Sequence, residues 1–510
     1  SCYMGIYASK KTGGDMLMEI SIGHQVEALL EYVAWTILWN KYFAVMFLVL
    51  GLYLTIGLRF FQFRRFGDIM RNTICTLFSK KNKSNKEGDG KVSSFGAFAT
   101  AVGSSVGNGN IAGVASAIAI GGPGAIFWMW MCALVGMATK MSEIVLTQTY
   151  RQKDNTGVPR GSAAYYIQKG LVEERGWKWC KGLSVIFTIA MLCAFYFTPG
   201  PYVVAESVQA GFNLSATGSI IFSVVYVILQ FVIILGGIKR IVKFAERIVP
   251  FMVVAYFGLA FFLFLSDISA TIEAFKSIFY CAFNPTAAVG GFAGVSVIMT
   301  LQVGVARSVY SNEAGWGSSP IIHAAAEVDH PARQGLWGAF EVFVDTIIVC
   351  TISGLIVVIT GVWQTGEGGA GSVGKALTQV FGPVGGIALA IFIFIFSLTT
   401  STGWYAYLEG LVGFLVRNKP AETRTKIVKF ITCTGPLFGL CATMFFFAHG
   451  TVPAVAWMVL DIQSAIPVYV NVVALTLLSP VIFKKVKEFE TDFLDPEKAA
   501  RKAVALNAED

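Results

Sequence analysis

The chain has 510 residues, of which 55% are hydrophobic and 14% are charged, whereas soluble domains carry roughly 25% charged residues. This composition excludes a string of soluble domains and favours one all-α domain that crosses a membrane many times. The net charge of +8 does not indicate a nucleic-acid partner, because the basic residues are spread over loops between apolar segments. We therefore expect a multi-pass protein of the cell membrane, with the lipid bilayer as its partner.

The N-terminal region, residues 1–38, precedes the first long apolar segment. Residues 1–15 are polar and rich in glycine, and they lack the apolar core and cleavage site of a signal peptide. Residues 17–38 combine three glutamates with leucine, valine and tryptophan, a pattern typical of an amphipathic helix on a membrane surface. The region is thus predicted to be a tail followed by an interfacial helix.

Eleven apolar segments follow, and each is long enough to cross a bilayer, which takes about 20 residues. They are residues 40–61, 94–121, 123–150, 182–211, 216–237, 243–266, 291–327, 335–361, 383–416, 427–449 and 453–482. Several exceed the required length and contain Gly or Pro, so tilted or broken helices are expected.

Lysine and arginine divide unevenly between the two sides of this eleven-span arrangement. One side holds 33 of the 39, counting nine in the loop 59–91 and eight in residues 140–181 with Lys140 included. The other side holds five, and Arg307 lies within a span. By the positive-inside rule the first side is cytoplasmic. The N-terminus is therefore predicted outside and the C-terminal tail, residues 483–510, in the cytoplasm. Residues 267–290 then form a short external helix, and the glycine-rich residues 362–382 form the longest external connection.

Two spans contain polar, glycine-containing stretches that a continuous helix does not favour. The first runs from Gly103 to Asn110 and the second from Arg307 to Pro320. At membrane depth the freed backbone groups must face protein, water or a bound solute. Because the two breaks lie five spans apart, the halves that contain them have opposite orientations. This is the pattern of an inverted-repeat secondary transporter, with its solute and ion sites between two broken helices.

The residue types at the centre suit a zwitterion and a hard cation. Backbone N–H groups at the start of a half-helix attract a carboxylate, and free carbonyls with hydroxyls suit Na⁺. In the ninth span, the stretch Phe396–Tyr405 contains five hydroxylated residues. Glu313 lies inside the second break, where it either braces the backbone or pairs with a substrate ammonium. Glu143, Arg307 and Glu409 are placed near cytoplasmic ends, as salt bridges of a gate or interface.

An enzyme is the weakest interpretation, because the sequence shows no nucleophile–base pair, metal-ligand cluster or phosphate-binding loop. No cofactor is expected beyond the coupling ion. Inverted repeats alone leave a channel or a sensor with a transport fold as alternatives.

The sequence resembles the alanine or glycine:cation symporter family. The resemblance rests on the run Gly107–Trp130, on Tyr310–Ser318 with His323–Ala326, and on Gly51–Thr55 with Arg59–Arg64. It implies a leucine-transporter-like fold of ten core helices in two inverted five-helix repeats, residues 94–266 and 267–482. Residues 39–93 would add an eleventh, N-terminal helix and a basic cytoplasmic loop. The implied activity is Na⁺-coupled symport of a small neutral amino acid by alternating access.

The resemblance also implies positions for the ligands. In the wider fold one Na⁺ lies between the first broken helix and the eighth core helix. Its ligands here would be the carbonyls of Gly103, Val106 and Phe396 and the hydroxyls of Thr399 and Thr400. The substrate carboxylate would meet N–H groups around Asn108 and Gly109. Asn110, Tyr310, Ser311, Asn312 and Trp404 would surround the rest of the substrate.

The chain departs from the family pattern at three places. Asn108 stands where Thr or Ser is usual, Trp316 stands where Leu is usual, and Pro199–Tyr202 occupies a region where a substrate-facing Gln is expected. Glutamine or another neutral amino acid as cargo, and H⁺ as coupling ion, therefore remain alternatives to alanine or glycine with Na⁺.

Overall fold

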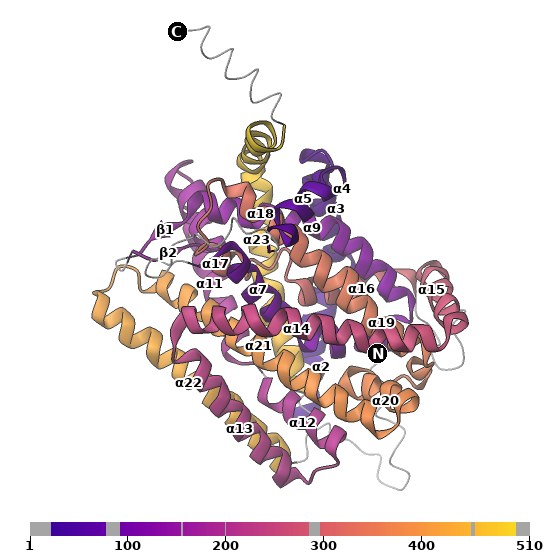
Figure 1. Ribbon diagram of the computed structural model, residues 1–510. Coiled ribbons are helices and arrows are strands. Elements are labelled where there is room, and N and C mark those ends of the chain that lie inside the picture. Colours follow the sequence, from indigo (N-terminus) through magenta and orange to yellow (C-terminus); the bar gives the residue numbers. More distant parts are fainter. Residues whose placement is uncertain are drawn as a thin grey trace, which may run out of the picture.

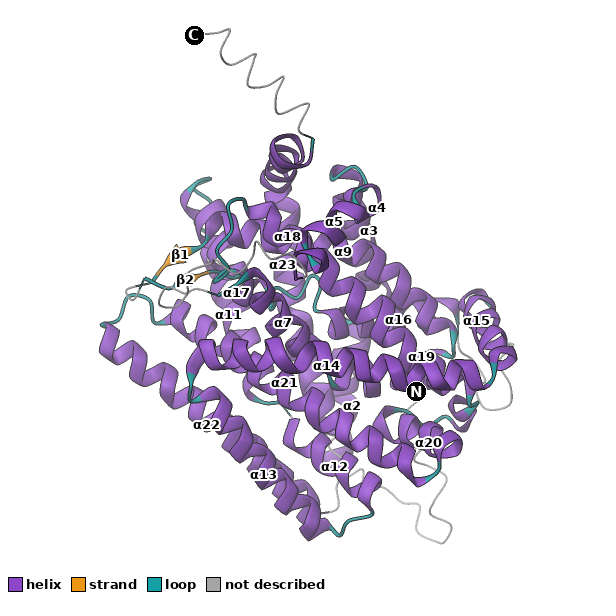
Figure 2. Ribbon diagram, in the orientation of Figure 1, coloured by secondary structure: helices purple, strands orange, loops and turns teal. Residues whose placement is uncertain are grey.

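The computed structural model describes residues 22–77, 92–154, 157–198, 200–284, 296–449 and 454–495. Within these ranges the chain is almost entirely helical, as Figure 2 shows. One short antiparallel hairpin, β1 (Gln152–Lys153) with β2 (Pro159–Arg160), interrupts the helices. The all-α prediction is confirmed for this part of the chain. The predicted tail 1–15 and most of the C-terminal tail lie outside the described residues.

Among the described residues, nine helices are long and apolar enough to cross a membrane. They are Val26–Gly57, Gly124–Tyr150, Cys180–Phe212, Ala216–Ile234, Gly237–Ser266, Pro331–Ile359, Pro383–Leu415, Ala421–Ala448 and Asp461–Leu494. Each overlaps a predicted span. The first, Val26–Gly57, also includes much of residues 17–38, which were predicted to form a separate helix on the membrane surface. The other two predicted spans, 94–121 and 291–327, contain the helix breaks and are too interrupted to satisfy the same length criterion. A count of eleven crossings thus stays a prediction.

The N-terminal segment forms α2 (Ile22–Glu31), the π-helix η2 (Tyr32–Leu38) and α3 (Lys41–Gly57). Asn40 starts α3, because its side chain accepts a hydrogen bond from the Phe43 N–H and so caps the helix. Three short helices follow on the loop side: α4 (Phe61–Arg64), α5 (Phe66–Asn72) and α6 (Ile74–Leu77).

The first broken helix consists of α7 (Ser94–Ser105), the π-helix η4 (Gly109–Gly113) and α8 (Val114–Gly121). The break is shorter than predicted. Helix α7 continues through the predicted break residues Gly103–Ser105. The Ser104 and Ser105 hydroxyls satisfy themselves within the helix, donating to the Thr100 and Val102 carbonyls. The helix ends where Val106 adopts an extended backbone, with φ −71° and ψ 98°. The unwound segment is therefore confined to Val106 and Gly107, because Asn108 already has helical backbone angles, φ −59° and ψ −30°.

The second broken helix consists of α16 (Val297–Asn312) and the single turn α17 (Pro320–His323). Helix α16 ends at Glu313, whose φ of 55° is left-handed and uncommon for a residue other than glycine. Gly315 and Gly317 follow with φ of 83° and 79°, which suit glycine. Pro320 restarts the helix at its first position, where a missing N–H costs nothing.

The remaining helices surround these two. The first half adds α9 (Gly124–Tyr150), α10 (Ala163–Tyr166), η5 (Ile167–Glu173), α11 (Cys180–Tyr196), α12 (Gly200–Phe212), α13 (Ala216–Ile234), α14 (Gly237–Ser266) and α15 (Ile268–Phe283). The second half adds α18 (Pro331–Val342), η7 (Phe343–Cys350), α19 (Thr351–Ile359), η8 (Val362–Thr365), α20 (Gly369–Phe381), α21 (Pro383–Leu415), α22 (Ala421–His449), α23 (Ala454–Phe489) and η9 (Glu490–Leu494).

These helices pack in two groups around the breaks. Helix α9 packs against α16 and α18, whereas α12 packs against α21 and α13. Helix α7 contacts both α14 and α21, and α13 lies beside α22 along one edge of the molecule (Figure 1). One continuous core of buried side chains joins both groups. The broken helices therefore lie in the interior, between two packed sets of long helices.

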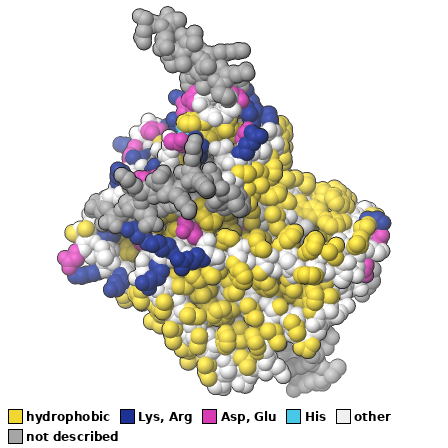
Figure 3. All heavy atoms as spheres, viewed as in Figure 1, with side chains coloured by type: hydrophobic (Ala, Val, Ile, Leu, Met, Phe, Trp, Pro, Cys, Tyr) yellow, Lys and Arg dark blue, Asp and Glu magenta, His cyan; other side chains and the backbone are white. Residues whose placement is uncertain are grey.

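The surface in Figure 3 is largely hydrophobic over the body of the molecule, and basic side chains gather toward the end where the C-terminal segment emerges. Helix α14 contributes exposed Phe251, Val254 and Phe262 to the apolar body. Large exposed apolar areas are unusual for a soluble protein and mark contact with lipid or partners. The distribution agrees with a protein that spans a bilayer.

Three predicted placements need correction. Lys140, counted with the cytoplasmic loop, lies inside α9 and is fully buried. Glu143 is likewise buried in α9, away from any helix end. Arg307 contacts Asp461 at the start of the last candidate span, so it belongs to the external half of the predicted topology. Residues 362–382 are also more ordered than a glycine-rich connection suggests, because they contain α20.

Candidate functional site

The two helix breaks lie side by side. A Cβ atom added to Gly109 would lie 3.2 Å from the Tyr310 ring. This distance is tighter than most Cβ contacts, so the close approach of the two breaks favours glycine at this position. On the far side of the same contact, Asp345 of η7 joins the breaks: Asn110 Nδ2 donates to Oδ1 at 2.7 Å, and the Ser311 hydroxyl donates to Oδ2 at 2.8 Å. The structure thus brings together the two segments that the sequence singled out.

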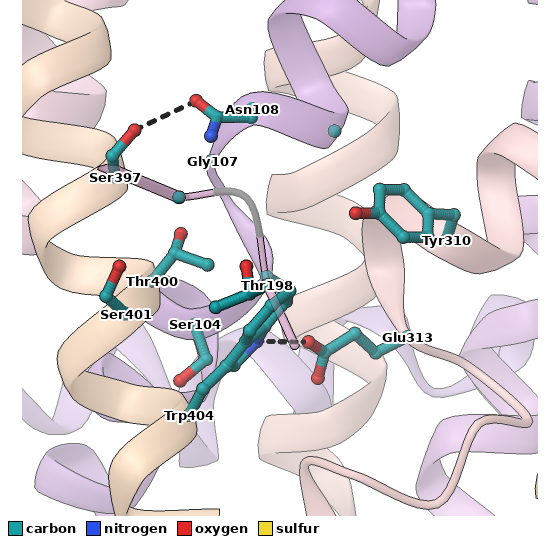
Figure 4. A pocket seen from close by; sticks show the side chains of 13 residues that line it. Ser104, Gly107, Asn108, Thr198, Tyr310, Glu313, Ser397, Thr400, Ser401 and Trp404 are labelled. Atoms are coloured by element: carbon teal, nitrogen blue, oxygen red, sulfur yellow. Dashed lines mark hydrogen bonds between the residues drawn. The ribbon is translucent and has the colours of Figure 1, made fainter. Parts of the chain in front are cut away.

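A cavity opens between these breaks and the middle of α21. It is lined by Ser104, Ser105, Gly107, Asn108, Gly109, Thr198, Gly200, Tyr310, Glu313, Ser397, Thr400, Ser401 and Trp404. Figure 4 shows the labelled side chains around it, with Asn108 at one end and Glu313 beside Trp404 at the other. Four elements thus contribute to one site: α7 with η4, the gap between α11 and α12, α16, and α21.

Four of the predicted substrate residues border this cavity: Asn108, Gly109, Tyr310 and Trp404. The Asn108 side-chain oxygen accepts a hydrogen bond from the Ser397 hydroxyl at 2.9 Å. The Trp404 indole N–H donates to Glu313 Oε1 at 3.3 Å. Both bonds appear in Figure 4 and tie α21 to the two breaks.

The side chains of Asn110, Ser311 and Asn312 do not line the cavity. Asn110 accepts from the Gly107 N–H at 2.9 Å and donates to Asp345. Asn312 donates to the hydroxyls of Ser308 and Thr346, at 3.1 and 2.9 Å, and accepts from the Ala314 N–H at 2.9 Å. These residues brace the breaks from behind, so they shape the cavity through the backbone.

The predicted Na⁺ ligands lie where α7 meets α21. The Thr400 hydroxyl donates to the Gly103 carbonyl at 3.2 Å, and the Thr399 hydroxyl donates to the Phe396 carbonyl at 2.8 Å. Val106 is the first residue of the unwound segment. Carbonyl and hydroxyl oxygens are the donors that a hard cation prefers. These oxygen atoms are chemically suited to coordinate Na⁺. In this structure the Thr399 and Thr400 hydroxyls form hydrogen bonds to carbonyl groups.

Several lining residues were not singled out individually from the sequence. Ser397 and Ser401 belong to the hydroxyl-rich stretch of the ninth span, so a signal existed for them. Thr198 and Gly200 flank an interruption between α11 and α12, whereas the sequence was interpreted as one span there. The Pro-Gly-Pro run at 199–201 could have indicated this third break.

Buried charges hold the second break from both sides. Lys140 Nζ donates to the Asn312 carbonyl at 2.8 Å and pairs with Glu341 at 3.0 Å. Glu341 in turn accepts from the Ser319 hydroxyl at 3.0 Å. Glu143 accepts from the Gly315 N–H at 3.2 Å and from the Asn471 side chain. The break is therefore pinned to α9 and α18 by charged groups with no solvent exposure.

Comparison with known proteins identifies the family and the fold. The model of the sodium:alanine symporter family matches residues 24–503. The chain belongs to this family. It is 36% identical over 88% of its length to the sodium/alanine symporter AgcS of Methanococcus maripaludis, of which 94% is covered. It is 35% identical over 91% of its length to the probable sodium/glutamine symporter GlnT of Bacillus subtilis, of which 91% is covered.

The fold is shared more widely than the family. The crystal structure of MhsT in complex with L-phenylalanine matches 78% of this chain and 99% of that chain, with a TM-score of 0.54 and 14% sequence identity. At that identity the match concerns the fold alone, and it fits the leucine-transporter-like prediction. Family membership makes the chain a multi-pass membrane protein of secondary active transport, and it points away from catalysis.

Proposed function

We propose that the chain carries out Na⁺-coupled symport of a small neutral amino acid into the cell by alternating access. The supporting observation is the cavity itself, bordered by both helix breaks and by the hydroxyl-rich middle of α21. The carboxylate would meet N–H groups near Asn108 and Gly109. The ion would lie among Gly103, Val106, Phe396, Thr399 and Thr400, next to the same unwound segment.

Family resemblance favours alanine or glycine as cargo, and similarity to a probable sodium/glutamine symporter makes glutamine the second candidate. The proposed orientation has the N-terminus outside and the C-terminus in the cytoplasm. An inward Na⁺ gradient would drive uptake, because the ion and the substrate would bind to the same unwound segment and cross the membrane together.

The test is uptake into proteoliposomes that contain the purified protein. Radiolabelled alanine, glycine and glutamine are supplied with an inward Na⁺ gradient, with equal Na⁺ on both sides, and with an inward H⁺ gradient in K⁺. Accumulation above the external concentration with the Na⁺ gradient supports the proposal. Accumulation driven by the H⁺ gradient alone would identify H⁺ as the coupling ion in place of Na⁺. Equilibration without accumulation indicates a channel, and no movement of any amino acid contradicts transport of this class.

A further inference from the structure

Every side chain that lines the cavity carries a hydrogen-bonding atom. Of its thirteen lining residues, three are glycines and the other ten carry a side-chain atom that can form hydrogen bonds. Apolar surface comes from the rings of Tyr310 and Trp404. A site for alanine would be expected to offer its methyl group an apolar contact, because ligand pockets are lined predominantly by hydrophobic side chains.

Four hydroxyl groups of this wall already donate their hydrogens and can only accept from a cargo. Ser104, Ser105 and Thr400 donate to backbone carbonyls of α7, and Ser397 donates to Asn108. Each of these hydroxyl oxygens keeps lone pairs that can accept. A cargo that brings donors therefore finds acceptors along this wall.

Glu313 supplies the strongest acceptor, at the end of the cavity away from Asn108 (Figure 4). Its side chain is 1% exposed, and each oxygen already accepts one bond, from Trp404 at 3.3 Å and from Ser318 at 2.6 Å. A carboxylate has about four acceptor positions, so further positions are available. Lys140, the buried ammonium close to this break, is bound to Glu341 and to the Asn312 carbonyl.

The backbone of Glu313 keeps this carboxylate in place. Its left-handed φ of 55° ends α16, and conformations of this kind persist where the surroundings over-determine them, often at functional sites. The last carbonyls of α16 add negative potential at the same point. A group that brings N–H donors to this end of the cavity is stabilised by both effects.

We propose that Glu313 is a specificity-determining residue, and that the preferred cargo is a neutral amino acid with a side-chain amide, such as glutamine. The carboxylate end lies near Asn108 and Gly109, the methylene groups pack on Tyr310 and Trp404, and the amide N–H₂ donates to Glu313. An aliphatic side chain would leave Glu313 and its neighbouring hydroxyls without that donor. Sites built to bond a polar group reject analogues that lack it far more strongly than apolar pockets reject an extra methylene.

This inference rests on the proposed function and selects the cargo within it. The experiment is a competition panel in proteoliposomes with an inward Na⁺ gradient, using L-glutamine, L-asparagine, L-alanine, L-norleucine and L-lysine. We expect glutamine to compete at least about 10-fold better than norleucine, which has a similar length and no amide. Alanine competing as well as glutamine, or lysine competing better, overturns the amide assignment.

Two substitutions locate the effect. Glu313→Gln should reduce the preference for glutamine over alanine about 10-fold, because the neutral amide oxygen is a weaker acceptor than a carboxylate oxygen. Thr198→Val, an isosteric change on the same wall, covers the case in which Glu313→Gln fails to fold, and it should lower the glutamine preference by a smaller factor. Glu422→Gln, at a highly exposed residue of α22, is the matched control and should leave every ratio unchanged.

The outcomes separate this inference from the function on which it depends. If the native protein accumulates no amino acid, the proposed function fails. If it accumulates glutamine and the folded Glu313 and Thr198 variants keep the native ratios, the assignment of Glu313 fails while the function stands.

Discussion

Thr400 of α21 contacts both the end of α7 and the unwound segment. Its hydroxyl donates to the Gly103 carbonyl at 3.2 Å, and Gly107, in the break, lies against the same side chain. A bound Na⁺ between these groups would take the lone pairs of both oxygens. The Thr400 hydroxyl thus forms a hydrogen bond to Gly103 in this structure, and it would coordinate the proposed Na⁺ when the ion is bound.

Thr400→Ala should raise the Na⁺ concentration for half-maximal uptake several-fold, because one of five oxygen ligands is lost. Maximal uptake at saturating Na⁺ should change less. Thr400→Ser keeps the hydroxyl and is the matched control, so it should retain the native Na⁺ dependence. An alanine variant with native Na⁺ dependence would remove Thr400 from the ion site.

For single residues, the sequence predicts which residues lie near the site better than it predicts where their side chains point. The five oxygen donors of the proposed ion site lie where α7 meets α21. Asn110, Ser311 and Asn312 were expected around the substrate, yet their side chains turn to Asp345, Ser308 and Thr346. Those partners come from other parts of the chain and cannot be seen from local spacing. For the same reason Thr198 was missed, because its role depends on an interruption between α11 and α12.

Among the helices, the second break depends on a buried ion pair. Lys140 of α9 and Glu341 of α18 are both fully buried and lie 3.0 Å apart. Through Asn312 and Ser319 they hold both ends of the gap between α16 and α17. This contact fixes the second break to the α9–α18 group, whereas Trp404 and Ser397 contact the breaks from α21.

Lys140→Met should destabilise the protein by about 3–5 kcal/mol, because it leaves the Glu341 carboxylate buried without its cation. The readout is the unfolding temperature in detergent, together with the saturable binding of labelled substrate. The double variant Lys140→Met with Glu341→Leu removes both charges and should recover part of the loss. A single variant that melts with the native protein would show that the pair contributes no net stability.

The breaks also show why the positions of elements were predicted to within a few residues and not more closely. Glycine and serine at 103–105 suggested an early break, but α7 packs against α14 and α21 and stays helical to Ser105. Helix α20 was missed because its glycines, taken alone, indicate a flexible connection. It packs against α21 and η4, and this tertiary packing outweighs the weak local preference.

A second contact between elements joins the C-terminal helix to the start of α18. The His330 ring stacks on Phe489 at 5.3 Å between centroids, and its Nδ1 accepts from the Ala332 N–H at 3.1 Å. Burial, with a contribution from Lys485, lowers the pKa of His330 below its ordinary value of 6.5, while Glu488 acts in the opposite direction. The folded protein therefore favours the neutral ring.

Since the pKa of His330 is lowered on folding, its contribution to stability is complete above about pH 6.5. It is lost as the pH falls from there toward the lowered value, because the unfolded chain binds the proton more readily. Between pH 7.5 and 5.5 the native protein should lose more stability than His330→Asn, which keeps a cap acceptor and does not titrate. Hydrogen exchange at Phe489–Leu494 measures the local effect. Equal pH dependence in both proteins would contradict it.

For the whole molecule, ion pairs place two distant parts of the chain on one side. Arg64 and Arg65 follow α3 and bind Glu490, at 2.5 and 3.0 Å, and Arg65 also binds Asp495 at 2.5 Å. The basic loop after α3 and the end of the C-terminal helix must therefore share a side of the membrane. Arg307, which pairs with Asp461 and covers the Trp35 ring, joins the starts of the first and last candidate spans at the other end.

These contacts allow the orientation predicted by the positive-inside rule to be tested at two positions that must lie on the same side of the membrane. Reporter fusions within residues 78–91 and after residue 495 should both report the cytoplasm, because the ion pairs hold the two segments together and the loop 59–91 carries nine Lys and Arg residues. A fusion at the connection between α14 and α15 should report the outside and serves as the control. Opposite sides for the first two fusions would contradict the contacts of Arg64 and Arg65 themselves. An external location for both would leave the fold intact and reverse the membrane orientation, while the inward Na⁺ gradient would still drive symport into the cell.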